Sequence, residues 1–301
     1  MKKEQQKHLG TVLLLFIICV LSLCLAGCST GTEKALLTVE EYPVMDGSTA
    51  NLPLMAEVMS QVCGISYEEA EQLTSCTTTP NAWLSLINGT ADILLVYEPA
   101  ASIKETIEQS GVDLDIQPIG RDALVFINNE SNPVGNLTSQ QLVDIYSGKI
   151  TNWQEVGGEN KEIIAYQRSE DSGSQSLFMK LLMKDVAPMK APTELAPAEM
   201  GMLIDRLAGY NNSANALGYS VYYYAKNMYN QPGLKFLAVD GVTPSDTSLE
   251  EGNYPFINDF YVVIRSDEPA DSPTRQLRDW ILSEDGVAAL RKAGYIPIAR
   301  Q

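Results

Sequence analysis

Short apolar runs typical of strands alternate along this chain with segments of helical spacing. Residues 92–97 (DILLVY) form an almost continuous apolar run, as expected for a strand buried on both faces. Before it, Leu52, Met55 and Met59 recur at helical spacing, and another helix is expected over 100–109. This alternation is typical of α/β proteins with mostly parallel sheets.

The remaining segments continue the same pattern. Strands are expected over 39–44, 123–128, 162–166, 216–221, 235–239 and 260–265. Helices are expected over 49–62, 80–87 (with Thr79 as its cap), 138–146, 172–184, 272–282 and 285–292. The length of 301 residues suggests about two domains, yet no long linker or internal repeat is visible. We therefore expect two lobes connected by strands that cross between them.

Charge and histidine content exclude several classes of function. The chain has 21 Lys and Arg against 38 Asp and Glu, a net charge of −17, which disfavours binding to nucleic acid. The single histidine, His8, lies in a segment that we expect to be removed. Without histidine, Ser–His–Asp and Cys–His catalysis and His-ligated metal sites are excluded. We predict a binding protein, not an enzyme, with no cofactor and no metal.

The N-terminus has the pattern of an export signal. Lys2, Lys3 and Lys7 precede an uncharged stretch over 9–32, which is typical of a secretory signal or of an uncleaved membrane anchor. Leu25-Ala26-Gly27-Cys28 resembles the lipobox of bacterial lipoproteins. That resemblance implies a signal peptide over 1–27, a lipid on Cys28 and a tether over 28–37. The remainder of the protein would lie outside the cytoplasm.

Two cysteines remain after Cys28. Cys63 and Cys76 are candidates for a structural disulfide in an exported protein. Their spacing is compatible with a disulfide, whereas the direction of their Cβ atoms cannot be read from sequence.

Three small polar turns are candidates for an anion site. They are residues 46–50 (DGSTA), 77–80 (TTTP) and 168–175 (RSEDSGSQ), and each precedes an expected helix. Free N–H groups at a helix start bind anions, hydroxyls add donors, and an arginine can grip an oxyanion with two parallel hydrogen bonds. The alternative for each turn is ordinary N-capping.

Several of these segments resemble the phosphate-binding proteins of ABC transporters. The most specific is YSGKITNW over 146–153, followed by residues 156–158. Residues 46–53, 168–178, 215–224 and 294–297 are also similar to that family. The resemblance implies a two-lobed, type II periplasmic-binding-protein-like α/β fold with a ligand cleft between the lobes. Lobe I would comprise 38–128 and 258–301, and lobe II would comprise 129–257.

The resemblance also implies a set of ligand-binding residues. They are Ser48, Thr49, Ala50, Thr79 and Glu98 in lobe I, and Arg168, Ser172, Gly173 and Ser174 in lobe II. The chain departs from the family pattern at Asp171 and Gln175, where a glycine and an arginine are usual. It also departs where the family has an aspartate that accepts a hydrogen bond from protonated phosphate, because Tyr97 stands in that register. Glu98, one position further on, could take that role. Alternatively, Glu98 could be only a residue at the start of a helix, immediately before Pro99.

The function implied is the capture of inorganic phosphate by a monomeric lipoprotein on the outer face of the cytoplasmic membrane. The chain has no nucleotide-binding G-x-x-x-x-G-K-[ST] motif, so an ABC permease system would supply the energy for transport. Two alternatives remain open. The same fold could bind another oxyanion or an organic phosphate, or it could be an adhesion or sensing module without a transport role.

Overall fold

Strand β2 (Ile93–Tyr97) is buried along its whole length, as its apolar run predicts. It belongs to a computed structural model that describes residues 35–298, except 171, 192–199 and 209–212. The predicted signal peptide, most of the tether, Cys28 and Asp171 therefore lie outside the described residues. From Leu37 onward the chain forms one compact unit. None of the helices in the described part of the chain is long and apolar enough to span a bilayer.

Strands and helices alternate as expected from the sequence, and several short elements that were not predicted lie between the expected ones. The strands are β1 (Met45–Gly47), β2, β3 (Leu114–Asn129), β4 (Asn136–Leu137), β5 (Ile164–Ala165), β6 (Ala216–Val221), β7 (Leu234–Phe236), β8 (Ala238–Val239), β9 (Ile257–Arg265) and β10 (Ile296–Pro297). The α-helices are α2 (Leu52–Cys63), α3 (Tyr67–Leu73), α4 (Thr79–Ile87), α5 (Ala101–Ser110), α6 (Ser139–Tyr146), α7 (Gly173–Leu177), α8 (Met200–Ala208), α9 (Asp246–Glu250), α10 (Pro273–Ile281) and α11 (Glu284–Lys292). The 3₁₀-helices are η1 (Thr49–Asn51), η2 (Trp153–Val156) and η5 (Ser213–Asn215). The π-helices are η3 (Phe178–Met183) and η6 (Tyr224–Met228).

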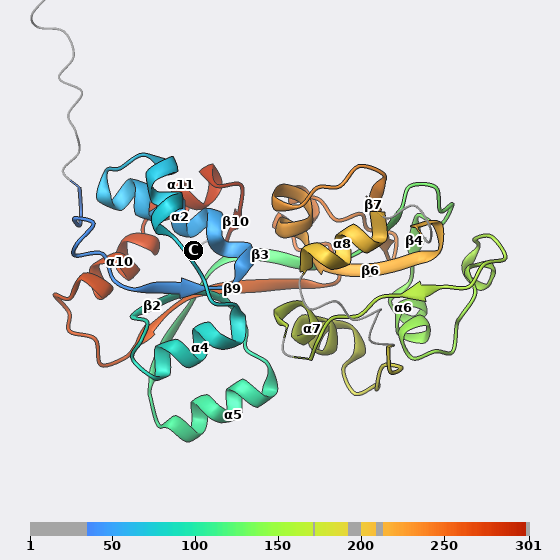
Figure 1. The fold of residues 1–301 in the computed structure, drawn as a ribbon, viewed down its shortest axis with the longest axis horizontal. Coiled ribbons are helices and arrows are strands. Elements are labelled where there is room, and N and C mark those ends of the chain that lie inside the picture. Colours follow the sequence, from blue (N-terminus) through green and yellow to red (C-terminus); the bar gives the residue numbers. More distant parts are fainter. Residues whose placement is uncertain (1–34, 171, 192–199, 209–212, 299–301) are drawn as a thin grey trace, which may run out of the picture. The chain divides into compact units, whose positions relative to one another are not determined.

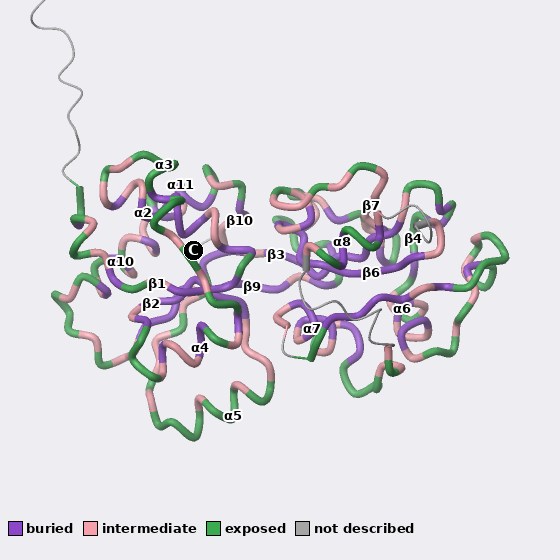
Figure 2. Tube along the Cα trace, in the orientation of Figure 1, coloured by how far each residue is buried: buried purple, intermediate pink, exposed green. Residues whose placement is uncertain are grey.

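Two lobes share two long strands (Figure 1). Lobe I comprises β1, β2, the parts of β3 and β9 that pair beside them, and the helices α2–α5, α10 and α11. Lobe II comprises β4–β8 and α6–α9. β3 pairs with β9 over Leu114–Ala123 and with β6 from Leu124 onward, so it changes partners between the lobes. Figure 2 shows these strands as a largely buried path through the molecule.

The pairing of the strands is mixed. The expected parallel pairing is found for β1 with β2, β5 with β6 and β4 with β8. The crossing strands β3 and β9 instead pair antiparallel with each other, and β9 also pairs antiparallel with β2. This departure from mostly parallel sheets arises because one crossing strand leaves lobe I and the other returns to it.

Several expected elements differ in the structure. The helix expected over 172–184 is divided into α7 and η3, and the strand expected over 235–239 is divided into β7 and β8. The strand expected over 39–44 is wrong: Thr38 and Glu41 exchange hydrogen bonds in a turn there, and the strand begins at Met45. Pro43 has no backbone N–H to give to a ladder, which explains the late start. β3 is 16 residues long and extends far beyond the expected 123–128. Its first half was not predicted because that half is only partly buried and lacks a continuous apolar run.

A buried carboxyl group lies on β3 where that strand passes between the lobes. Asp122 is 1% exposed and accepts hydrogen bonds from the Tyr97 hydroxyl at 2.6 Å and from the Tyr223 N–H at 3.1 Å. Burial raises the pKa of Asp122 to about 6 in spite of these hydrogen bonds.

We expect protonation of Asp122 to stabilise the fold. Because the pKa is about 6 when folded against 3.8 ordinarily, the folded state binds the proton more tightly between these values. The free energy of unfolding should therefore fall by roughly 3 kcal/mol from this group as the pH rises from about 4 to about 6. Urea unfolding across this range should show a shallower fall for Asp122→Asn, while the exposed Asp267→Asn should match the parent. Equal slopes for Asp122→Asn and the parent would contradict this role.

Candidate functional site

Ser48 and Thr79 meet at one end of the lobe I sheet. Ser48 follows β1 and Thr79 is the first residue of α4, and their hydroxyl oxygens lie 2.7 Å apart. The Ser48 hydroxyl also accepts the backbone N–H of Tyr97 at 3.1 Å. Both residues are buried, and their contact joins the first two polar turns expected from the sequence, 46–50 and 77–80.

The lobe I turn is held by a carboxylate. Asp46 accepts the Thr77 N–H at 2.8 Å and the Thr77 hydroxyl at 2.6 Å. Beside it, a Cβ on Gly47 would lie 2.1 Å from the Leu95 carbonyl oxygen, so only glycine fits against β2. These contacts fix the path of the chain into Ser48.

Thr78 has an unusual backbone conformation next to the site. Its φ of 105° lies in a region that β-branched residues rarely adopt. Thr78 is the N-cap residue of α4 but its side chain makes no capping hydrogen bond, and Thr79 is the first helical residue instead of the expected cap. Backbone conformations of this kind cluster at active sites, ligand clamps and switch regions.

The lobe II turn is built around Arg168. Its backbone N–H donates to the Tyr219 hydroxyl at 3.0 Å and to Gln175 Oε1 at 3.2 Å, and the residue is 8% exposed. Tyr219 is stacked on Phe178, with ring centroids 4.5 Å apart, so the hydroxyl that holds Arg168 is itself fixed by the aromatic core. Gln175 also accepts a hydrogen bond from Tyr219.

The serines of this turn follow Arg168 closely. Ser172 caps α7, since its hydroxyl accepts the Gln175 N–H at 3.1 Å. Ser174 is 2% exposed and its hydroxyl oxygen lies 3.5 Å from that of Ser172. Ordinary capping is therefore part of the role of Ser172.

The two lobes touch at Gly173. A Cβ on this residue would lie 2.7 Å from the Thr79 hydroxyl oxygen. Gly173 of lobe II therefore lies directly against the Ser48–Thr79 pair of lobe I. The structure brings together Ser48, Thr79, Ser172, Gly173 and Ser174, with Arg168 in the same lobe II turn.

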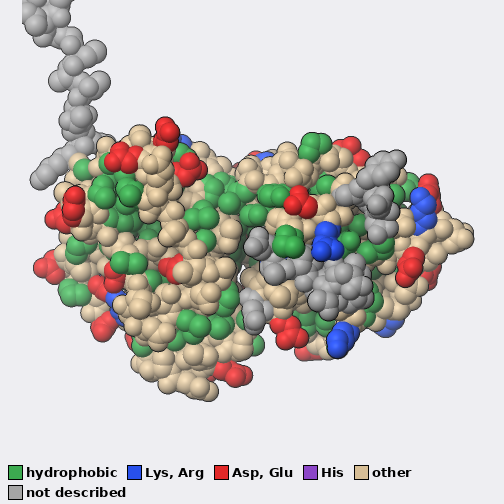
Figure 3. Space-filling view, in the orientation of Figure 1, with side chains coloured by type: hydrophobic (Ala, Val, Ile, Leu, Met, Phe, Trp, Pro, Cys, Tyr) green, Lys and Arg blue, Asp and Glu red, His purple; other side chains and the backbone are tan. Residues whose placement is uncertain are grey.

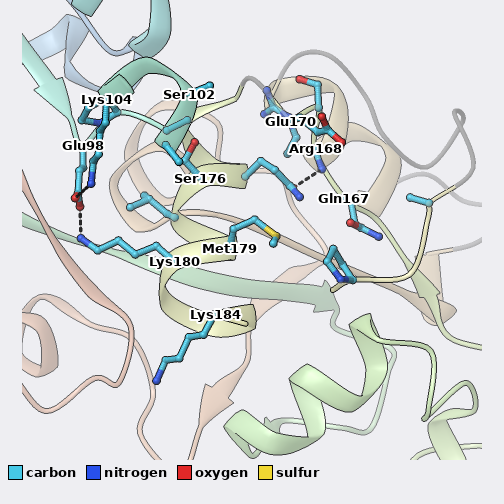
Figure 4. Close-up of a pocket in the computed structure, with 18 of the residues that line it drawn as sticks. Glu98, Ser102, Lys104, Gln167, Arg168, Glu170, Ser176, Met179, Lys180 and Lys184 are labelled. Carbon is cyan, nitrogen blue, oxygen red and sulfur yellow. Dashed lines mark hydrogen bonds and ion pairs between the residues drawn. The ribbon is translucent and has the colours of Figure 1, made fainter. Parts of the chain in front are cut away.

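Glu98 directly follows β2, and its carboxylate belongs to an ion pair that joins the lobes. Its carboxylate contacts Lys104 Nζ at 2.5 Å and also Lys180 Nζ from lobe II (Figure 4). Burial raises the pKa of Glu98, but the two ammonium groups outweigh it and hold the pKa below its ordinary value. By contrast, the Tyr97 side chain is buried and directs its hydroxyl to Asp122.

Thr49 and Ala50 continue from Ser48 into η1. Thr49 is exposed, and its hydroxyl oxygen lies 4.0 Å from Cys76 Sγ. Ala50 is buried, and its carbonyl accepts the Tyr295 hydroxyl at 2.6 Å. That bond ties the turn to the C-terminal segment of the described chain.

The expected disulfide is not formed. Cys63 and Cys76 are both free thiols. Cys63 ends α2, whereas Cys76 contacts Thr49, which lies before the same helix. A helix of 12 residues is about 18 Å long, whereas the Cα atoms of bridged cysteines lie within about 7 Å of each other. Cys63 and Cys76 therefore lie near opposite ends of α2, too far apart for a disulfide.

Several residues of the site were not predicted. Asp46 lies in the predicted turn, but its partnership with Thr77 could not be read from the sequence. Lys180 was expected only as part of a helix, and its partner Glu98 is 82 positions away. Lys180 lies on the π-helix η3, and short π-helical segments often occur at functional sites.

Comparison with known proteins places the fold in a family. Residues 34–285 match the model of the PBP superfamily domain. The chain belongs to the PBP superfamily. This membership confirms the predicted two-lobed α/β fold and agrees with a binding protein rather than an enzyme.

Relatives of this PBP-superfamily chain include phosphate-binding proteins. PstS of Borreliella burgdorferi is 25% identical over 267 residues, which is 86% of this chain and 91% of that protein. PstS of Bacillus subtilis is 26% identical over 200 residues, covering 66% of this chain and 62% of that protein. A phosphate-bound structure of a putative phosphate ABC transporter substrate-binding protein from Clostridium perfringens has a TM-score of 0.66 at 24% identity, covering 86% of this chain and 100% of that chain.

Proposed function

We propose that this chain captures inorganic phosphate between its lobes and delivers it to the permease of an ABC transporter. One observation carries the proposal: the hydroxyls of Ser48 and Thr79 meet the Gly173 turn of the opposite lobe, and Arg168 begins that turn. A ligand held by both sides would favour the closed arrangement of the lobes.

The chemistry of these groups suits a tetrahedral oxyanion. Hydroxyls donate and accept, and a guanidinium offers two parallel N–H bonds that match a pair of phosphate oxygens. The net charge of −17 does not prevent binding, because exposed charges are screened over about 8 Å at physiological salt. The buried donors act at contact, where screening is weak.

The location and partners form part of the same proposal. The names of the relatives support a role in phosphate transport. The lipobox-like segment supports a lipid on Cys28 and attachment to the outer face of the cytoplasmic membrane, where we propose that the protein acts as a monomer. We keep Thr49, Ala50 and Glu98 among the proposed ligand-binding residues.

We expect phosphate to bind and sulfate to bind much more weakly. Glu98 is kept ionised by its lysine partners, so it can accept a hydrogen bond from the O–H of hydrogen phosphate but repels sulfate, which has no such proton. Titration calorimetry of the anion-stripped protein with phosphate, sulfate and molybdate measures this preference. Glu98→Gln should reduce the ratio of phosphate to sulfate affinity by about tenfold or more.

Glu105→Gln is the matched control, because Glu105 is an exposed carboxylate on α5. It should leave the preference unchanged. An absence of heat with phosphate would overturn the proposed function, and tight molybdate or sulfate binding would assign the site to another oxyanion. A Glu98→Gln protein with the parent preference would remove Glu98 from the selectivity role alone.

A further inference from the structure

One helical segment of lobe II touches lobe I at two places. The first contact is made by Gly173, at the start of α7, which lies against the Thr79 hydroxyl. The second is made by Lys180 on the π-helix η3, whose ammonium group contacts the Glu98 carboxylate. α7 and η3 follow each other without a break, so one continuous segment carries both contacts.

Glu98 is held in place for this contact by its own lobe. One carboxylate oxygen pairs with Lys104 of α5 at 2.5 Å, and the other pairs with Lys180 (Figure 4). Glu98 also directly follows β2, whose last residue, Tyr97, donates its backbone N–H to the Ser48 hydroxyl. The carboxylate is therefore anchored at the same strand end as Ser48, and its bond with Lys180 crosses to the opposite lobe.

A second carboxylate of lobe I lies near Lys180. Burial raises the pKa of Asp259 on β9, and the positive charges of Arg121 and Lys180 oppose that rise. Asp259 lies opposite Arg121 in the ladder of β3 and β9, within lobe I. Lys180 thus brings a positive charge from lobe II close to two carboxylates of the opposite lobe.

The acidity of the protein gives this positive charge its importance. The net charge is −17, and Figure 3 shows acidic side chains over both lobes on the face in view, where basic ones are few. Like charges on the two lobes oppose closure, because self-repulsion disfavours a compact state. A cation placed between carboxylates of the opposite lobe offsets part of that repulsion when the lobes are closed.

The contact is also open to salt. Glu98, Lys104 and Lys180 line a groove of about 1010 Å³ whose walls come from both lobes. The side chain of Glu98 is 23% exposed, and those of Lys104 and Lys180 are 47% and 51% exposed. Exposed ion pairs are weak and are screened by salt. The contact can therefore adjust closure by a modest factor that depends on ionic strength.

We propose that Lys180 is a positioning residue for phosphate binding, because its ion pair with Glu98 stabilises the closed, ligand-bound arrangement of the lobes. Lys180 acts through Glu98 and does not touch the ligand. Lys104 keeps the Glu98 carboxylate in place for this contact. The inference concerns closure around the proposed ligand, so it rests on the proposed function.

Calorimetric titration with phosphate at low and at high salt tests this role. Lys180→Gln should weaken phosphate binding about two- to fivefold at low salt, and its difference from the parent should shrink at high salt. Lys180→Arg keeps the charge and should stay closer to the parent. In a Glu98→Gln protein, the Lys180→Gln change should lose most of its effect, whereas a role confined to lobe II would give the same loss in both backgrounds.

Lys149→Gln is the matched control. Lys149 pairs with Asp144 inside lobe II at 3.1 Å, so this variant also loses one charge and one ion pair, but none between the lobes. Its phosphate affinity should equal that of the parent at both salt concentrations. The inference is overturned if Lys180→Gln binds phosphate as Lys149→Gln does, if its loss does not shrink with salt, or if the loss is undiminished in the Glu98→Gln protein.

Failure of the parent to bind phosphate is a separate result, which counts against the proposed function. Small-angle scattering of the ligand-free proteins then decides the role of Lys180. Lys180→Gln should be more expanded than Lys149→Gln at low salt, and equal dimensions would overturn the inference.

Discussion

Replacing Arg168 with alanine should abolish most of the phosphate affinity. Loss of one charged partner from a buried ion pair costs about 2–5 kcal/mol, so we expect a decrease of roughly 30-fold to 5,000-fold in calorimetric titrations. The ligand-free protein should melt near the parent temperature, because the hydrogen bonds from the Arg168 backbone N–H to Tyr219 and Gln175 do not involve the guanidinium. Arg168→Lys keeps the charge but not the planar pair of donors, and it should recover only part of the affinity.

Arg206→Ala provides the matched control. Arg206 is an exposed arginine on α8 of the same lobe, so its removal changes the net charge equally. Its phosphate affinity should equal that of the parent. If Arg168→Ala binds phosphate as tightly as Arg206→Ala does, Arg168 does not hold the ligand.

A single methyl group at Gly173 should prevent the lobes from closing. The added Cβ would lie 2.7 Å from the Thr79 hydroxyl oxygen, closer than such contacts allow. Overpacking costs about 1–3 kcal/mol, and here that cost falls on the closed state alone. We expect Gly173→Ala to weaken phosphate binding by roughly 5-fold to 150-fold with little change in ligand-free stability.

The measurement combines calorimetry with small-angle scattering. The parent should contract when phosphate is added, and Gly173→Ala should contract less. Gly135→Ala is the control, because Gly135 lies in lobe II with no atom within 4 Å of its added Cβ. A Gly173→Ala protein with parent affinity would show that this contact does not belong to the binding-competent state.

The sequence predicts the elements whose signals are local. The apolar run of β2 and the helical spacing of α2 both appear as expected. Thr138 forms the capping box that starts α6, and Gly148, with a φ of 81°, follows its end. Each of these features depends on residues a few positions apart.

Contacts between distant segments account for what could not be predicted. The ion pair of Glu98 with Lys180 joins positions 82 apart, and nothing in the sequence marks these two residues as partners. The separation of Cys63 from Cys76 depends on the direction of α2, which spacing alone does not reveal. The turns of the site were found because each has a local sequence pattern, whereas the contact of Gly173 with Thr79 depends on the packing of the two lobes.

The shared strand β3 has a consequence for how the protein unfolds. Its first half belongs to the lobe I ladder and its second half to that of lobe II, without a break in the chain. Neither lobe can lose its sheet without freeing half of a strand that the other lobe needs. The two lobes are therefore one cooperative folding unit, and neither is a module that could be cut out and moved to another protein.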